Sequence, residues 1–324
     1  MTRTRSLAAS LLSFSAAAML VLFGASTANA APAASDETST PSVASAKVDS
    51  AGAAEFWTAD RMRAAIPGDV LAGKAPGRSA SFTSSDNVGV ETRKNTKVKG
   101  TKADNGNAKL ASKAAAVSHI GKVFFTMGAA NYVCSGNAVT SQNESTVATA
   151  GHCVSEGAGA FATNFTFVPA YDNGAAPYGK WTANDLYTTP QWKEKGDIAF
   201  DTGFAVMDPL NGLNLTDVVG SSEVAFNAHR GLQYTSYGYP AAKPFNGEQL
   251  WSCAGTATPD TTHPEFGTQG IPCTMTGGSS GGPWLLNNGA QNSINSYGYN
   301  NSGVMYGPYW GAEIQSVYNL AQAA

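Results

Sequence analysis

Short apolar runs separated by turn residues make up the chain from about residue 120 onward. They are rich in β-branched and aromatic residues, and Gly, Asn, Asp and Pro stand between them. This pattern predicts an all-β domain, a barrel or a sandwich. Ile314, Val317 and Tyr318 follow the spacing of one helix face, so we expect one amphipathic helix at the C-terminus. The apolar runs lie at residues 123–126, 132–140, 146–150, 161–168, 204–207, 234–239 and 250–256.

The first thirty residues have the pattern of a secretory signal peptide. Arg3 and Arg5 precede an apolar run over about residues 7–23, and small residues at Ala28 and Ala30 suit signal peptidase. A membrane anchor is the alternative, but the run is short and an Ala/Ser/Thr/Pro stretch follows it at once. We therefore expect residues 1–30 to be removed and the protein to be secreted, without contact to a membrane.

Residues 31–115 predict a propeptide or linker that is largely disordered. Residues 31–55 hold too few large apolar side chains to form a core. The apolar residues between 56 and 66 fit a short amphipathic helix that ends at Pro67. A disordered spacer is the alternative, and we favour a propeptide that covers the following domain until it is cut away.

Charge is distributed unevenly along the chain. Residues 1–115 hold 14 Lys and Arg against 9 Asp and Glu, whereas residues 116–324 hold 6 against 14. Phosphate binding needs a basic surface, so the acidic second part argues against nucleic acid as a partner. The strongly basic stretch 93–113 suits docking of the propeptide on the acidic domain.

Four cysteines lie in the β-rich part, at positions 134, 153, 253 and 273. In an exported protein they favour disulfides over free thiols, and four cysteines allow three pairings. A metal site is the alternative. However, no Cys-x-x-Cys pair occurs, and the neighbours His152 and Cys153 do not easily converge on one tetrahedral ion. We expect two local disulfides and no metal.

The motif Thr149-Ala150-Gly151-His152-Cys153 follows a strand-like run. A histidine at a strand end is held by rigid backbone while its imidazole reaches a cleft, where it can accept and return a proton near neutral pH. Taken alone, the motif also fits a structural histidine in a turn.

A second motif, Gly278-Ser279-Ser280-Gly281-Gly282-Pro283, surrounds a serine with glycines. Glycines allow a tight turn that exposes the hydroxyl and directs backbone N–H groups to one point, as an oxyanion hole requires. The pattern also matches the Gly-x-Ser-x-Gly elbow of α/β-hydrolases, whose triad runs Ser, acid, His. Here the last histidine, His263, precedes Ser280, and alternating helices are missing, so that fold is excluded.

Taken together, the two motifs resemble the trypsin/chymotrypsin-like serine peptidases, and more closely their bacterial secreted branch, over about residues 120–324. The resemblance implies a chymotrypsin-like domain over residues 116–324: two six-stranded antiparallel β-barrels with a C-terminal helix. Cys134 and Cys153 match the disulfide that this family has beside its histidine. Cys253 is then expected to pair with Cys273.

The resemblance also implies an acid on a strand between the two motifs, and two aspartates compete for that role. Asp201 leads into the apolar run 204–207, whereas the strand that Asp197 would open runs into Asp201-Thr202-Gly203. We choose Asp201 and keep Asp197 as the alternative.

The function implied is that of a secreted serine endopeptidase acting through an acyl-enzyme. Ser280 would attack the peptide carbonyl, His152 would transfer the proton, and Asp201 would hold the imidazole. The N–H groups of Gly278 and Ser280 would receive the oxyanion, and no cofactor is needed. The expected partners are protein or peptide substrates of a monomeric enzyme. An exported, catalytically inactive relative that only binds peptides is the alternative.

Six further positions bear on substrates and activation. Ser296-Tyr297-Gly298 resembles the family strand that pairs with the substrate backbone, although a core edge strand would look the same. Ser279 replaces the aspartate that receives the new N-terminus in animal zymogens, so that ion pair cannot serve here. Thr274 is neutral where trypsins have an acid, so Arg/Lys specificity is unsupported. Asn295 stands where some glutamyl-specific relatives have histidine, so Glu specificity is unsupported too.

Overall fold

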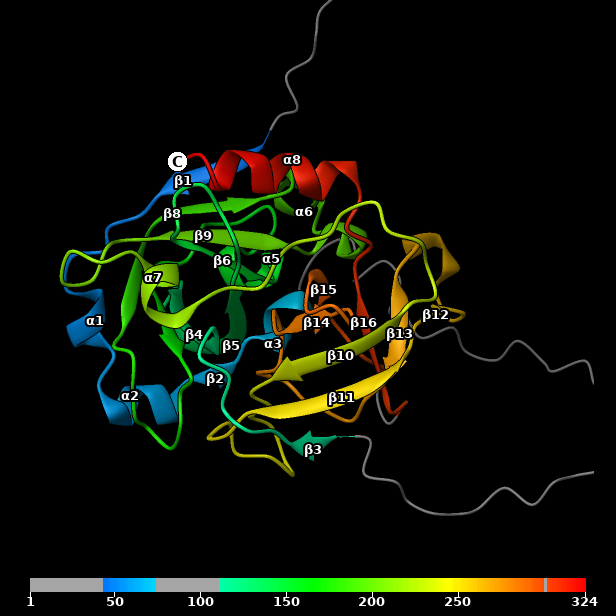
Figure 1. The fold of residues 1–324 in the computed structure, drawn as a ribbon, viewed down its shortest axis with the longest axis horizontal. Coiled ribbons are helices and arrows are strands. Elements are labelled where there is room, and N and C mark those ends of the chain that lie inside the picture. The colour runs from blue at the N-terminus through cyan, green and yellow to red at the C-terminus, as the bar shows by residue number, and fades with distance from the viewer. Residues whose placement is uncertain (1–42, 74–110, 300–301) are drawn as a thin grey trace, which may run out of the picture. The chain divides into compact units, whose positions relative to one another are not determined.

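Figure 1 shows a computed structural model of the chain, which describes residues 43–73, 111–299 and 302–324. These residues all belong to the unit Thr40–Ala324. The expected signal peptide and the basic stretch up to residue 110 lie outside the described residues.

Six antiparallel strands of the first half close into a barrel. Around the barrel each strand pairs with the next, and β8 pairs with β9 to complete the circle. Buried side chains such as Val123, Phe125 and Phe167 fill its interior. In order around the barrel the strands are β4 (Ile120–Met127), β5 (Ala130–Ala138), β6 (Thr146–Thr149), β9 (Gly203–Met207), β8 (Trp181–Thr188) and β7 (Thr163–Pro169).

The second half is also antiparallel, and its strands form two sheets in the part of the chain described. The five-stranded sheet has the order β15-β14-β10-β11-β3, and the three-stranded sheet has the order β12-β13-β16. A disulfide from Cys253 in β11 to Cys273, just after β13, joins them. The strands are β3 (Ser112–Lys113), β10 (Gln233–Gly238), β11 (Trp251–Thr256), β12 (Thr258–Pro259), β13 (Gln269–Pro272), β14 (Pro283–Leu285), β15 (Gln291–Ile294) and β16 (Val304–Gly307).

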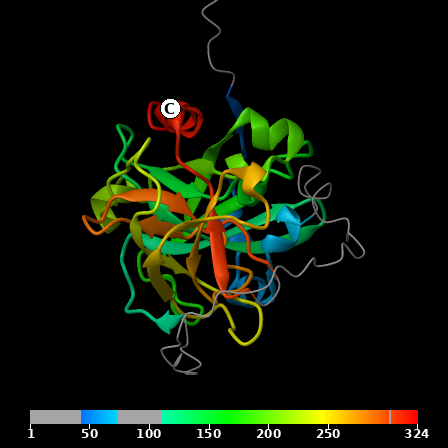
Figure 2. The same ribbon diagram turned by 90° about the vertical axis from the view of Figure 1, so that its right-hand side faces the viewer.

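The chymotrypsin-like fold expected from the sequence is therefore confirmed, with one difference in detail. The first half is a closed six-stranded barrel, whereas the second half divides its strands between two sheets. The edge view in Figure 2 shows the orange-red strand β16 across the front of this second half and the helix α8 at the upper edge.

Helices are few and short. The C-terminal helix α8 (Ala312–Ala321) is present as predicted and packs Ile314, Val317 and Tyr318 into the core of the first barrel, beside β8 (Figure 1). Within the described ranges, no helix has the length and apolar character needed to span a bilayer. After residue 111, the other helices described are α5 (Gly151–Val154), α6 (Pro190–Lys195), α7 (Leu215–Val219) and two 3-10 turns, η1 (Ile198–Phe200) and η2 (Pro264–Phe266).

Residues 43–73 have a defined structure on the first barrel, which differs from the disorder expected for most of 31–115. At one end β1 extends the sheet beyond β8 with antiparallel pairing, and at the other β2 pairs in parallel with β5. Figure 1 shows this segment in blue, with α1 and α2 on one side of the barrel and α3 near the centre of the view. Its elements are β1 (Ala44–Lys47), α1 (Ala53–Phe56), α2 (Ala59–Ala64), β2 (Ile66–Pro67) and α3 (Asp69–Ala72).

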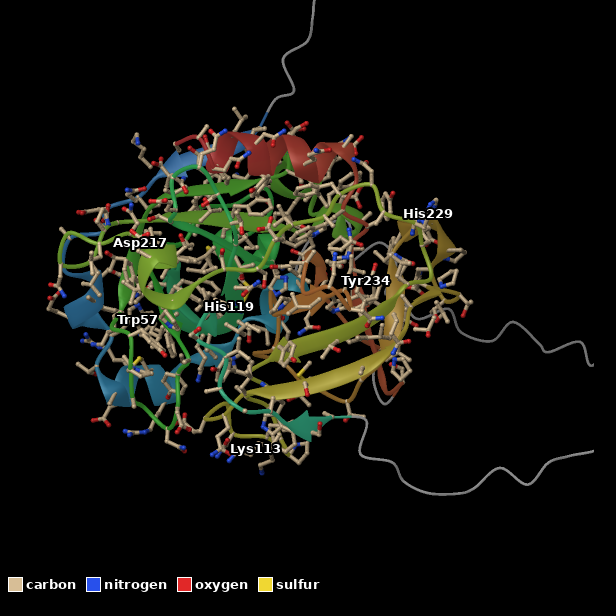
Figure 3. All side chains as sticks on the ribbon, viewed as in Figure 1. Trp57, Lys113, His119, Asp217, His229 and Tyr234 are labelled. Carbon is tan, nitrogen blue, oxygen red and sulfur yellow. A yellow bond between two sulfur atoms is a disulfide. The ribbon has the colours of Figure 1, made fainter. Side chains whose placement is uncertain are left out.

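Trp57, which follows α1 and precedes α2, fixes this segment to the barrel (Figure 3). Its side chain is fully buried, its ring centroid lies 5.4 Å from that of Phe124, and its Nε1 donates a hydrogen bond to the carbonyl oxygen of Asn164 over 2.7 Å. The expected single helix ending at Pro67 is two short helices instead, because the chain turns inward at Trp57. Burial of a tryptophan contributes about 3 kcal/mol or more, so Trp57 is a major anchor of this segment.

Candidate active site

His152 lies on a short helical turn immediately after strand β6. Strand β6 ends at Thr149, and α5 begins at Gly151. A Cβ on Gly151 would lie 2.9 Å from the ring of Trp192 and 3.0 Å from Asp201 Oδ1, so only glycine fits there. The disulfide from Cys153 to Cys134 in β5 holds this turn against the barrel. The backbone around His152 is therefore fixed by close packing and a covalent link.

Asp201 binds both the ring and the backbone of His152. Its Oδ2 lies 2.8 Å from His152 Nδ1, and its Oδ1 accepts a hydrogen bond from the His152 backbone N over 2.8 Å. Ser296 Oγ donates a further hydrogen bond to Asp201 Oδ2 over 2.5 Å. All three side chains are buried. This arrangement leaves His152 Nε2 as the ring nitrogen without a hydrogen-bond partner among the described residues.

Asp197 lies one turn earlier and does not reach the histidine. Its Oδ1 accepts a hydrogen bond from the backbone N of Ala199 over 3.1 Å and so caps the 3-10 turn η1. That turn carries the chain inward, so that Asp201, the residue after it, is fully buried. Of the two aspartates considered from the sequence, the structure brings Asp201 to His152.

The loop that carries Ser280 is held by a residue of the first barrel. Ser135 donates its backbone N–H to the carbonyl oxygen of Ser280 over 2.7 Å, and its Oγ donates to the carbonyl oxygen of Gly278 over 2.9 Å. Ser135 follows Cys134, the partner of Cys153 in the disulfide beside His152. One stretch of β5 therefore fixes both the serine loop and the histidine turn.

Glycines allow this loop to approach the histidine turn closely. Gly278 and Gly281 have φ angles of 94° and 79°, a region that side chains disfavour. A Cβ on Gly281 would overlap Thr149 Oγ1 and would lie 2.7 Å from the backbone N of Ala150, at the start of α5. The motifs at 149–153 and 278–283, which are far apart in sequence, are neighbours in the fold.

A cavity of about 530 Å³ opens beside Ser280. Thr274, Met275 and the stretch Ser296–Gly298 line it, as does Asp69 of α3. Thr274 is exposed, so the position where trypsins have their acid lies open to solvent rather than at a buried floor.

The stretch 296–298 combines two roles. Ser296 donates to Asp201, as described above. The Ser-Tyr-Gly pattern of the sequence did not predict this contact. The Tyr297 ring stacks on that of Tyr306 with centroids 5.1 Å apart, and its hydroxyl donates to Asp260 Oδ2 over 2.8 Å. Gly298 is exposed at the cavity. Residues 296–298, which are expected to contact the substrate, therefore line the cavity beside Ser280.

Sequence reasoning missed Asp69 and Trp192. A Cβ on Gly277 would overlap the Asp69 carboxylate, so α3 of the N-terminal segment lies directly against the serine loop. The ring of Trp192 lies edge-on to that of His152, with centroids 6.2 Å apart. Neither residue belongs to a recognisable motif, and only the folded chain brings them to the site.

Cys134, His152 and Cys153 are close enough together to suggest a metal site. The two sulfur atoms are bonded to each other, however, so neither is a thiolate ligand. His152 Nδ1 is engaged by Asp201. The donor set therefore does not suit a metal ion.

Solved structures that are similar to this chain include proteases. No protein-family model matches the chain. Among solved structures the chain is similar to the protease Anisep from Arthrobacter nicotinovorans, with 65% identity and a TM-score of 0.65 over 66% of this chain and 100% of that one. It is also similar to AL20, a thermostable serine protease from an extremophilic microorganism, with 53% identity and a TM-score of 0.62 over 64% of this chain and 98% of that one.

Two further proteins are less similar to this chain. A Glu endopeptidase shares the fold at 21% identity, with a TM-score of 0.55 over 66% of this chain and 97% of that one. An extracellular metalloprotease of Bacillus subtilis (strain 168) is 30% identical over 121 residues, and the match spans 37% of this chain and 37% of that protein.

The fold and the two close structural relatives define a serine endopeptidase. The chain belongs to the trypsin/chymotrypsin-like serine peptidases.

Proposed function

We propose that this protein is a secreted serine endopeptidase that cleaves protein or peptide substrates with Ser280, His152 and Asp201. The observation that carries the proposal is the pair of hydrogen bonds that Asp201 accepts from the ring and the backbone N–H of His152. Such a pair fixes both the orientation of the imidazole and the nitrogen that carries its proton.

In the reaction, Ser280 Oγ attacks the substrate carbonyl carbon while His152 Nε2 takes the hydroxyl proton. The C–N bond breaks as His152 returns this proton to the leaving amine, and an acyl-enzyme remains. Water then attacks the ester, His152 takes a proton from it, and Ser280 leaves with that proton. Asp201 stays ionised and stabilises the imidazolium in both steps.

The N–H groups of Gly278 and Ser280 are proposed to bind the oxyanion. In a trans peptide the N–H points away from the preceding carbonyl. The Gly277 carbonyl oxygen accepts from the backbone N of Ala241 over 2.6 Å, so the N–H of Gly278 points to the opposite side. Loss of one such donor costs about 3 kcal/mol of transition-state stabilisation in comparable enzymes.

Secretion and maturation belong to the same proposal. The signal-peptide pattern in residues 1–30, two disulfides and an extracellular relative support export. Leu71 and Ala72 of α3 are buried against the peptidase domain, and Asp69 lines the cavity at Ser280. Protease substrates bind as extended strands. Because α3 is a helical turn, it covers the cleft but does not present an extended peptide bond for cleavage. We infer that the protein is made as a zymogen.

The test is labelling of the secreted, processed protein with a fluorophosphonate. We expect one label on Ser280 and none in Ser280→Ala. If the folded, processed wild type does not react, the protein is an inactive exported binding relative instead. N-terminal sequencing of the same sample shows whether the segment before residue 111 has been removed.

A further inference from the structure

Asn295 has a fully buried side chain behind the serine loop, directly after β15. Its Oδ1 accepts from Ser236 Oγ over 2.6 Å and from Trp284 Nε1 over 2.8 Å. Its Nδ2 donates to the carbonyl oxygens of Tyr237 over 2.8 Å and Ser279 over 3.0 Å. Both lone pairs and both N–H groups of the amide are used. A side chain bonded this completely has a single orientation.

The bond from Asn295 to Ser279 acts on the peptide that joins Ser279 to Ser280. Because that peptide is planar, a carbonyl oxygen held toward Asn295 directs the Ser280 N–H to the opposite side. The Ser280 N–H is one of the two donors proposed for the oxyanion. The Ser279 carbonyl oxygen also accepts from the Gly282 N–H over 3.0 Å, so the side chain of Asn295 and this backbone bond together set the direction of a proposed oxyanion donor that Asn295 does not itself touch.

We propose that Asn295 is a positioning residue that holds the Ser280 N–H in its oxyanion-binding direction. The proposal rests on the function proposed above. It also explains how the loop keeps its shape without the aspartate that animal zymogens have before the nucleophile. The Oγ of Ser279 donates to the carbonyl oxygen of Thr276 over 2.8 Å, so a neutral acceptor within the same loop engages this side chain.

The backbone of Asn295, independently of its side chain, connects the serine loop to the chain after β15. Gly281 donates its N–H to the carbonyl oxygen of Asn295 over 2.7 Å, and Asn295 donates its N–H to that of Gly282 over 2.9 Å. A change of side chain at Asn295 leaves both bonds available. The Gly282 N–H then holds the Ser279 carbonyl oxygen alone, so the expected defect is a less firmly directed peptide at Ser280, with the loop still in place.

A role in substrate selection is the competing interpretation of Asn295. The cavity beside Ser280 is lined by Ser296, Tyr297, Gly298 and Tyr299, and Asn295 is not among its lining residues. Its amide is instead directed at the serine loop and at strands β10 and β14. Changes at Asn295 should therefore alter turnover much more than substrate binding.

The test compares Asn295→Asp with Asn292→Asp in the processed enzyme. Asn292 is a matched control: it lies on β15, is buried, accepts from the Tyr234 hydroxyl over 2.8 Å and donates to the Ala225 carbonyl oxygen over 2.6 Å. Both changes keep the size of the side chain and remove its N–H donors. Tm measures the structural cost of each variant, and kcat and KM on one peptide substrate measure its effect on the reaction.

We expect both variants to lose Tm, and Asn295→Asp alone to lose about 10- to 100-fold in kcat with KM within about two-fold. A peptide aldehyde, whose adduct places an oxyanion in the site, should bind Asn295→Asp more weakly by the same factor. Equal kcat and aldehyde affinity in the two variants would overturn the proposal. Should Asn295→Asp fail to fold, Asn295→Ser against Asn292→Ser gives the same comparison. A wild type that does not react with fluorophosphonate would overturn the proposed function instead.

Discussion

The backbone N–H of Ser135 donates to the carbonyl oxygen of Ser280 over 2.7 Å, so the first barrel holds the serine loop of the second half. The same strand carries Cys134, whose disulfide fixes the turn of His152. The spacing of the proposed nucleophile and the proposed base thus depends on one strand, β5. Changes in that strand should affect turnover out of proportion to their effect on stability.

Replacement of Ser280 by alanine should abolish turnover and leave the fold intact, because the hydroxyl supplies chemistry rather than packing. We expect kcat to fall by about 10⁶-fold, as for other triad nucleophiles. Peptide hydrolysis and Tm of the processed protein measure the two effects. Ser279→Ala is the control and should lose far less activity. Substantial hydrolysis by Ser280→Ala would assign the nucleophile to another residue.

Asp201→Asn should be far more damaging than Asp197→Asn. Only Asp201 binds His152 Nδ1, and an amide there stabilises the wrong tautomer of the ring, which costs about 10⁴-fold in kcat for the well-studied triad. Asp197→Asn keeps an oxygen that can cap η1, so we expect nearly full activity. Measured kcat values in the opposite order would transfer the acid to Asp197.

The two disulfides should differ in function although they close loops of similar length. Each spans about twenty residues, for which chain entropy gives ~3 kcal/mol of stability. Replacing Cys134 and Cys153 by serine should also reduce kcat, because that bond fixes the turn of His152. Replacing Cys253 and Cys273 should lower Tm by a similar amount with a smaller loss of kcat. Equal losses of kcat at equal loss of Tm would contradict this distinction.

Buried Lys122 should make stability depend on pH in the alkaline range. Burial lowers the pKa of its ammonium to about 8, against an opposing effect of Glu248, and its Nζ donates to the Gly247 carbonyl oxygen. Between pH 8 and the ordinary value of 10.5, the unfolded chain holds the proton that the folded chain has lost. The contribution of Lys122 to the free energy of unfolding therefore rises with pH across this range.

Lys122→Met removes this contribution. The Tm of the variant relative to wild type should consequently fall as the pH is raised from 8 to 10, measured by calorimetry in matched buffers. Lys195→Met, at an exposed position, is the control and should show no such trend. A difference between Lys122→Met and wild type that is constant with pH would contradict the prediction.

Activity should tolerate a variable start of the processed chain. Relief of a blocked cleft does not require one particular N-terminal residue, and Ser279 cannot receive a new ammonium group. The structure limits the possible starts, because β4 begins at Ile120 and Lys122 is buried within it. We expect starts from 111 to 119 to be active and starts beyond 120 to fail to fold.

Refolded variants that begin at successive residues test this prediction, with Tm as the measure of folding. A sharp requirement for one first residue would instead indicate an insertion switch that uses another carboxylate. Full activity of the chain that still contains residues 43–73 would remove the zymogen proposal.

Much of the barrel and the positions of the two motifs could be predicted because the signals are local. Gly151 precedes His152 and glycines surround Ser280, and the apolar run after Asp201 favoured it over Asp197. Strand β8 was missed because its sequence, WTANDLYT, mixes polar and apolar residues. The short strands after residue 258 were missed because two to four residues carry too little pattern.

Other features depend on contacts between distant segments. The role of Asn295 depends on Ser236, Trp284 and Ser279, none of which is its neighbour in sequence. The order in residues 43–73 depends on a site for Trp57 that the barrel provides through Phe124 and Asn164. The composition of this segment predicts that it cannot fold alone. It folds here against the first barrel, which its composition does not exclude.

The two strand pairings of the N-terminal segment affect what happens after it is cut. Strand β1 is bound to β8 and strand β2 to β5, and Trp57 is buried between these attachments. A single cut between residues 73 and 111 would leave this peptide attached without a covalent link. Freshly cut enzyme would then be a complex with its own tight inhibitor. Activity would rise on dilution, as the peptide dissociates. Digestion of the bound peptide by enzyme that is already free would make the onset of activity autocatalytic, with a lag.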